Sequence, residues 1–162
     1  MNEPKKKLRV GWFCFTCCED STIVMTESMN EHWQEWKKLL DFRSARVLKK
    51  NNVLDKMDVA FVEGAITCEK YRQKLLKIRG LAEVVVAVGA CAVTGMPSAQ
   101  RNLFDEKTNQ EIKFLLDRFD QLPRVLKIAE VVKVDATLPG CPMDEKQFLE
   151  LLDKMLKRFK IK

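Results

Sequence analysis

The sequence lacks any apolar run of the roughly 18 to 20 residues that a membrane-spanning helix needs. Its first residues, Met-Asn-Glu-Pro-Lys-Lys-Lys, lead straight into a short apolar run, without the apolar stretch and cleavage site of a secretory leader. Internal repeats, low-complexity tracts and linkers are also missing. We therefore expect a cytoplasmic protein with one domain over residues 1–162, a length that can bury a full core without disulfides.

Histidine is scarce, and the single residue, His32, falls in a helical segment where we expect it at the surface rather than as a ligand. Motifs for binding DNA or RNA and aromatic stacking platforms are absent, although the net charge is +6. The basic residues are spread along the chain, so most of them are expected to be solvated. A nucleic-acid-binding domain is thus a weak alternative, and no nucleic-acid partner is expected. An acidic protein such as a ferredoxin, or an anionic membrane surface, is left open as a partner for these charges.

Apolar runs typical of buried strands alternate along the chain with segments of helical periodicity. Strands are expected over residues 8–15, 46–48, 59–64, 84–91 and 131–135, and helices over 22–40, 67–79, 105–119 and 144–159. The first helix could be broken near residues 28–30. This order predicts an α/β fold in which helices cover both faces of an open, mainly parallel sheet, with the ligand at the carboxyl ends of the strands.

The cysteines are the most informative residues that the chain contains. Five of the six fall where predicted strands run into loops, in segments 13–18, 89–91 and 139–142. A [4Fe–4S] cluster needs four thiolates that converge on one point, and loops at one edge of a parallel sheet can supply them. This pattern predicts an iron–sulfur site.

The candidate ligands follow from the three loops. Cys91 and Cys141 each stand alone in a glycine-bearing loop, whereas the first loop offers Cys14, Cys17 and Cys18 for the two remaining places. We take Cys17, Cys18, Cys91 and Cys141 as the ligands, with Cys14 as the alternative. The sixth cysteine, Cys68, is expected to act only as a small apolar side chain.

Two other cysteine chemistries fit the sequence less well. A structural zinc site also takes four thiolates, but such sites usually come as paired Cys-x-x-Cys knuckles, and two of the ligands here are isolated. A zinc-stabilised binding module is therefore the weaker interpretation. Cys14 and Cys17 have the spacing of a thioredoxin-like motif, but that hypothesis leaves Cys91 and Cys141 unexplained.

At these residues the chain resembles the small subunits of [NiFe] hydrogenases, whose fold is shared by the cluster-bearing 20 kDa subunit of complex I (NADH:ubiquinone oxidoreductase). The matching stretches are 11–21, 58–64, 84–95 and 132–135 running into 139–142. The resemblance implies a flavodoxin-like three-layer sandwich. It also implies a proximal [4Fe–4S] cluster that takes electrons from a separate large subunit and passes them to downstream carriers.

The chain departs from the hydrogenase pattern in the first loop, where that family usually has Cys-x-x-Cys. The tandem of Cys17 and Cys18 resembles the complex I arrangement, and it keeps residues 11–18 in step with the family's strand without a gap. Pairing Cys14 with Cys17 would restore the hydrogenase arrangement and leave Cys18 supernumerary. We favour the tandem, which leaves open whether the partner subunit carries NiFe and turns over hydrogen.

Because the sequence ends soon after the helix that follows Cys141, we expect it to be without the cysteine-rich C-terminal region with which many hydrogenase small subunits bind two more clusters. We expect one [4Fe–4S] cluster and a non-catalytic, electron-transferring subunit of a hydrogenase-type oxidoreductase. A complex I-like subunit without hydrogenase activity is the alternative. The expected partners are a large subunit and a further electron-transfer subunit or ferredoxin, with membrane association only through the complex.

Two glutamates and the apolar stripe of the first helix also bear on this interpretation. Glu19 and Glu63 are expected near the cluster loops, either in proton transfer or as hydrogen-bonding residues. The tryptophan and methionine stripe of helix 22–40 is expected in the core, and any exposed part of it would suit a large-subunit interface.

Overall fold

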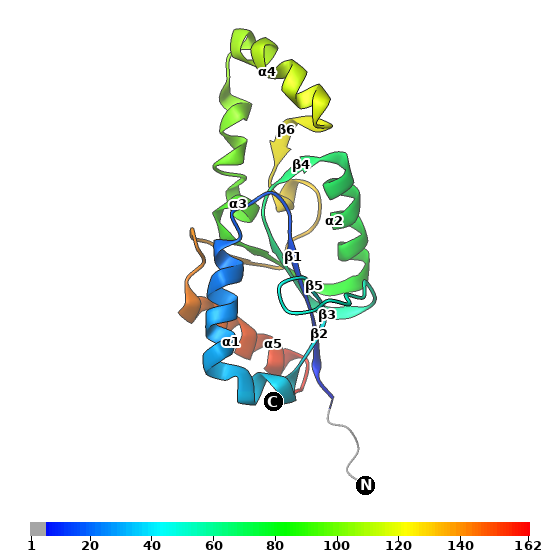
Figure 1. The fold of residues 1–162 in the computed structure, drawn as a ribbon. Coiled ribbons are helices and arrows are strands. Elements are labelled where there is room, and N and C mark those ends of the chain that lie inside the picture. Colours follow the sequence, from blue (N-terminus) through cyan, green and yellow to red (C-terminus); the bar gives the residue numbers. More distant parts are fainter. Residues whose placement is uncertain (1–5) are drawn as a thin grey trace.

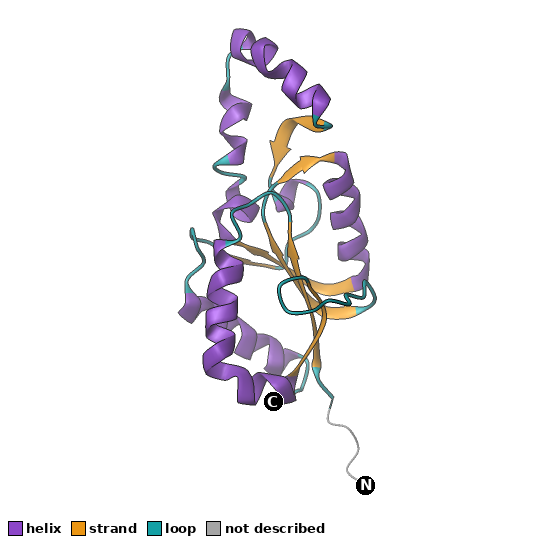
Figure 2. Ribbon diagram, in the orientation of Figure 1, coloured by secondary structure: helices purple, strands orange, loops and turns teal. Residues whose placement is uncertain are grey.

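The computed structural model describes residues 6–162 (Figures 1 and 2). Residues 1–5, which include the start of the lysine-rich N-terminal segment, lie outside the described residues. The main sheet has five strands, β1 (Leu8–Cys14), β2 (Leu40–Ala45), β3 (Met57–Glu63), β5 (Ala82–Val88) and β7 (Ala136–Leu138). Its order is β2-β1-β3-β5-β7 and every neighbouring pair is parallel. This is the flavodoxin-like strand order, so the predicted fold class is confirmed.

Helices cover both faces of the sheet, as Figure 1 shows. One face packs against α1 (Asp20–Leu39) and α5 (Glu145–Arg158), and the other against α2 (Glu69–Leu81), with α3 (Gly89–Thr94) and the short η2 (Ile128–Glu130) beside it. All seven residues of β3 are buried. Its side chains alternate, so that Phe61 belongs to the α1 and α5 core while Ala60 and Val62 belong to the α2 core.

A smaller unit extends beyond the carboxyl end of the main sheet, at the top of Figure 1. It contains η1 (Ser98–Leu103), α4 (Glu106–Arg118) and an antiparallel pair formed by β4 (Ile66–Cys68) and β6 (Gln121–Leu126). No residue of α4 is buried. Among residues 6–162, none of the helices combines the length and the apolar character needed to cross a membrane.

The structure corrects two predicted strands. The strand expected over residues 46–48 is a turn, and β2 instead follows directly on α1, which is one unbroken helix. Burial explains the shift, because Leu40 and Ala45 are buried whereas Val47 is 54% exposed.

The strand expected over residues 131–135 is irregular, and β7 begins only at Ala136. Asp135 stands where that strand would pair with β5. Its N–H donates to the Val85 carbonyl oxygen at 2.9 Å, and its carboxylate accepts from the Val85 N–H at 2.8 Å. The Asp135 side chain thus takes the place of one backbone hydrogen bond between strands. The apolar residues that precede it form a loop.

Candidate functional site

Three of the predicted ligands meet at the carboxyl edge of the sheet. Cys18 lies in the loop after β1, Cys91 in the first turn of α3, and Cys141 in the loop after β7. All three line one small pocket together with Glu63, the last residue of β3. The prediction that Cys91 lies in a loop is wrong, because α3 begins directly at the end of β5.

Hydrogen bonds tie the three cysteine-bearing segments to one another. The Ala90 N–H donates to the Gly140 carbonyl oxygen at 2.7 Å, which joins α3 to the Cys141 loop. The Met143 N–H donates to the Ser21 hydroxyl oxygen at 3.2 Å, which joins the same loop to α1. The positions of the three backbones are therefore fixed by contacts outside the cysteines themselves.

Two glycines allow these segments to approach closely. Gly140 has φ +116°, and a Cβ placed there would lie 2.5 Å from the Pro142 carbonyl oxygen. Gly89 has φ +79°, and a Cβ there would lie 3.0 Å from the Ser21 hydroxyl oxygen. Both positions need a residue without a side chain, which explains the glycines that accompany Cys91 and Cys141.

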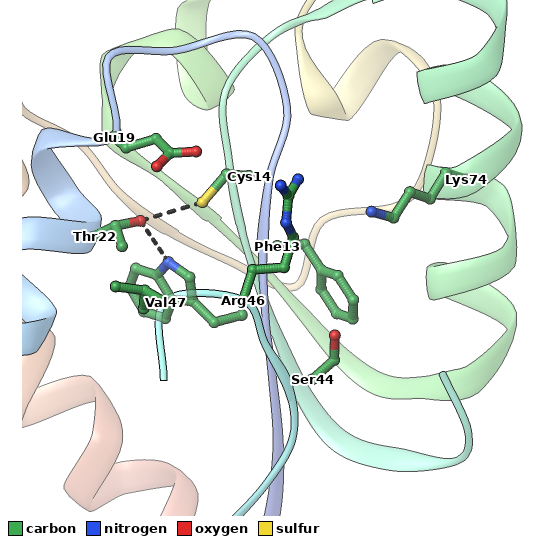
Figure 3. Close-up of a pocket in the computed structure, with 9 residues that line it drawn as sticks. Phe13, Cys14, Glu19, Thr22, Ser44, Arg46, Val47 and Lys74 are labelled. Carbon is green, nitrogen blue, oxygen red and sulfur yellow. Dashed lines mark hydrogen bonds between the residues drawn. The ribbon is translucent and has the colours of Figure 1, made fainter. Parts of the chain in front are cut away.

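Cys17 lies apart from the other three predicted ligands. Its thiol lies 3.8 Å from the Phe15 carbonyl oxygen and has the Cys14 thiol as a neighbour. The interaction between the two thiols lowers the pKa of Cys14 and raises that of Cys17. Cys14 in turn lies 3.2 Å from the Thr22 hydroxyl and lines a different cavity (Figure 3).

Glu63, the last residue of β3, accepts hydrogen bonds from the first residues of α1. Its carboxylate accepts hydrogen bonds from the Ser21 N–H at 3.1 Å, the Thr22 N–H at 3.1 Å and the Thr22 hydroxyl at 2.7 Å. Glu19, the residue before the helix, makes no capping hydrogen bond through its side chain. Glu63 therefore satisfies helix N–H groups that a local cap would normally take.

Burial dominates the electrostatics of the pocket. It raises the pKa of Cys91, and the neighbouring thiols of Cys18 and Cys141 raise it further because three negative charges would repel one another. Burial also raises the pKa of Glu63, although the hydrogen bonds from Ser21 and Thr22 oppose this. Thiolates at this point thus need a positive charge among them.

The metal-binding groups at this pocket are thiols. Within residues 6–162, no three histidine, cysteine, aspartate or glutamate side chains are gathered around a single-ion site. Three thiols nevertheless surround one pocket, with Cys17 next to one of them in sequence. Cys68 ends β4 and does not line that pocket. Soft sulfur donors on separate loops suit an iron–sulfur cluster, in which each thiolate can bind its own iron.

The other residues singled out from the sequence lie in α1. His32 stacks on Trp36 in α1 with a centroid distance of 5.7 Å, and it is only partly exposed. Met25, Met29 and Trp36 lie in the core as predicted, whereas Trp33 is 48% exposed. The exposed Trp33 lies near β2 and lines a surface hollow together with Leu40 and Phe42.

Comparison with known proteins gives several matches. The family of the NADH ubiquinone oxidoreductase 20 kDa subunit matches residues 16–155. The NAD-reducing hydrogenase HoxS subunit delta of Cupriavidus necator is 32% identical over 114 residues, which cover 60% of this chain and 54% of that protein. The sulfhydrogenase 2 subunit delta of Pyrococcus furiosus is 26% identical over 121 residues, covering 73% of this chain and 48% of that protein. The chain thus spans about half the length of these relatives.

Solved structures agree with these matches. A chain of an NAD+-reducing [NiFe]-hydrogenase in the H2-reduced state superposes with a TM-score of 0.75 at 25% identity, covering 94% of this chain and 93% of that one. A [NiFeSe]-hydrogenase of Dm. baculatum shares the fold, with a TM-score of 0.68 at 12% identity over 95% of this chain and 63% of that one. The chain therefore belongs to the family of oxidoreductase subunits that comprises the complex I 20 kDa subunit and the [NiFe] hydrogenase small subunits.

Proposed function

We propose that this chain is the electron-transferring small subunit of a [NiFe]-hydrogenase-type oxidoreductase and holds one [4Fe–4S] cluster. The observation that carries the proposal is the meeting of Cys18, Cys91 and Cys141, from three strand ends, around one pocket. A cluster bound there would accept and release single electrons. The chain itself supplies the thiols, the buried surroundings and the fixed backbone, and no catalytic group is assigned to it.

The fourth ligand is proposed to be Cys17. It is adjacent to Cys18, so it reaches the pocket if its side chain leaves Cys14 and turns toward Cys91. Cys14 is the alternative, but it ends β1, where its thiol lies beside Thr22 and lines another cavity. Sequence adjacency to Cys18 favours Cys17.

The partners follow from the family. The matched subunits come from complexes such as the NAD-reducing hydrogenase, so we assign a large subunit to this chain as the source of its electrons and a further electron-transfer subunit or ferredoxin as the recipient. Membrane association, if the complex has it, would come through another subunit. The proposed large-subunit side is the carboxyl edge of the sheet, where the cysteine pocket opens.

A complex I-like subunit that turns over no hydrogen is the second candidate. It is favoured by the adjacent Cys17 and Cys18 and by the family description, which names NADH ubiquinone oxidoreductase. Nickel analysis and a hydrogenase assay of the purified complex separate the two. Nickel together with hydrogen-dependent dye reduction supports the first candidate, and their absence from a complex that keeps its iron supports the second.

The cluster itself is tested by iron, acid-labile sulfide and zinc analysis of the anaerobically purified chain, with an EPR spectrum after dithionite reduction. About four iron and four sulfide per chain and a reduced-cluster signal are expected. Stoichiometric zinc without iron, in protein isolated from its own cells, would overturn the proposal.

A further inference from the structure

A second cavity lies beside the cysteine pocket, and no residue lines both. Its volume is about 250 Å³. It opens at the carboxyl ends of β1 and β2, where Cys14 and Ser44 lie, and Lys74 of α2 forms its opposite wall (Figure 3). None of the four predicted ligands lines it. Ligands usually bind in such crevices in open α/β sheets.

Two cationic side chains line this cavity without an ion-pair partner among the described residues. Arg46 and Lys74 both line it, and neither forms an ion pair with any residue in the described range 6–162. The Lys74 amino group instead lies 5.9 Å from the ring centroids of Phe13 and Phe15. Burial lowers the pKa of Lys74, and the guanidinium of Arg46 lowers it further. Two positive charges that line one cavity are stabilised by an anion between them.

Ser44 adds a hydroxyl to the lining of this cavity. Ser44 is only 8% exposed and lines the cavity. Its hydroxyl makes no hydrogen bond with any of the described side chains or backbone groups, and in Figure 3 it points toward the Phe13 ring. A serine hydroxyl that lines a cavity can donate a hydrogen bond to a ligand there.

The carboxylate of Glu19 also lines the cavity, but it does not neutralise the cations. It is exposed and lies within 4.0 Å of neither Arg46 nor Lys74. Its negative charge would oppose the binding of another anion. Removing this charge should therefore strengthen anion binding, whereas removing either cation should weaken it.

From this geometry we propose that Arg46, Lys74 and Ser44 form a binding site for a small oxyanion group, a carboxylate or a phosphate. The volume lies below the usual range for sites of drug-sized ligands, about 300 to 1,000 Å³, so the group belongs to a small acid or to an acidic side chain of a docked protein. A guanidinium matches the planar or tetrahedral array of oxygens in such a group. This proposal goes beyond the cluster function and does not depend on it.

The first test uses the anaerobically purified full chain, with inorganic phosphate and glutarate as probes at constant ionic strength in calorimetric titrations. One saturable site is expected. Arg46→Ala and Lys74→Ala should each weaken affinity about tenfold or more, because each removes a charge-assisted hydrogen bond. Glu19→Gln should tighten binding. Lys77→Ala is the matched control, since Lys77 is exposed on the same helix and does not line the cavity.

The site is overturned if neither probe binds saturably, or if Lys77→Ala weakens binding as much as Lys74→Ala. Iron is measured on every variant, so loss of the cluster is recorded separately from loss of the anion.

The second test uses the purified complex and distinguishes the two sources of the oxyanion group, a free small acid and an acidic side chain of a partner. An acid released stoichiometrically on denaturation identifies a free ligand, whereas a complex that excludes phosphate and dissociates on Arg46→Ala identifies a partner's side chain. A complex that does neither also overturns the proposal.

Discussion

Glu63, at the end of β3, accepts hydrogen bonds from both the backbone N–H and the hydroxyl of Thr22 in the first turn of α1, at 3.1 and 2.7 Å. A residue 41 positions away in sequence therefore completes the start of this helix. The same carboxylate lines the cysteine pocket, so the fold and the candidate site share one side chain.

Replacing Glu63 by alanine should lower the free energy of unfolding by about 2 to 3 kcal/mol, because buried N–H groups of Ser21 and Thr22 lose their acceptor. Urea unfolding followed by circular dichroism measures the change. Glu111→Gln, at an exposed position of α4, is the control and should change stability by less than about 0.5 kcal/mol. Equal losses in the two variants would show that Glu63 does not support α1.

Serine substitutions test the proposed ligands. Cys18→Ser, Cys91→Ser and Cys141→Ser should each lower the iron content of anaerobically purified protein well below that of the wild type, because a hydroxyl is a poor substitute for a thiolate. Cys68→Ser should keep its iron, since Cys68 does not line the pocket. Retention of full iron by two of the three variants would contradict the site.

The fourth ligand is decided by comparing Cys14→Ser with Cys17→Ser. Because Cys17 is the proposed ligand, its variant should lose iron, or show an altered EPR signal, while the Cys14 variant keeps both. The two thiols are neighbours, so each substitution is expected to have a small effect on stability. The reverse result would assign Cys14 and restore the Cys-x-x-Cys arrangement of hydrogenases.

The order of the main helices and strands was predictable, because the spacing of apolar residues in a long segment indicates which of its residues are buried. The strand expected over residues 84–91 corresponds to β5, although β5 runs from Ala82 to Val88 and residues 89–91 begin α3. Short strands carry too few residues for a pattern, so β4 and β6 were missed, and residues 46–48 were chosen over β2. The replacement of a ladder rung by Asp135 depends on Val85, which lies 50 residues away and leaves no local signal.

The candidate site was predictable to the level of its loops. Cysteines at strand ends must meet at one edge of a parallel sheet, which brought Cys18, Cys91 and Cys141 together. The direction in which Cys17 points depends on side-chain rotation, which spacing does not encode. Sequence reasoning placed Glu63 near the site, but its role as a cap for α1 required the three-dimensional contact.

Stability at low pH should depend on Asp58. Burial disfavours its charge, but hydrogen bonds from the Arg9 side chain at 2.7 Å and the Arg9 N–H at 2.8 Å outweigh this and lower the pKa of Asp58. A lowered folded pKa stabilises the protein above the ordinary aspartate pKa of 3.8, and this contribution is lost as the pH falls through the folded value.

Asp58→Asn should therefore cost about 1 to 2 kcal/mol at pH 7, and the difference from the wild type should shrink below about pH 4. Urea unfolding across pH 3 to 7 measures it. Glu150→Gln, at an exposed position of α5, is the control and should show no such dependence. A difference that stays constant across this range would refute the assigned ion pair.

The last prediction concerns the backbone of the Cys141 loop. Gly140→Ala places a Cβ 2.5 Å from the Pro142 carbonyl oxygen at φ +116°, so the loop must move. We expect a loss of about 2 kcal/mol or more in unfolding free energy and a lower iron content, because Cys141 moves with the loop.

Gly80→Ala is the matched control. Gly80 lies in α2, and a Cβ there meets no atom within 4 Å, so alanine should stabilise the protein by about 0.5 kcal/mol and leave the iron unchanged. The two variants add the same methyl group with opposite expected signs. If Gly140→Ala unfolds like the wild type and keeps its iron, the loop is not fixed by this glycine and Cys141 needs no special backbone to reach the pocket.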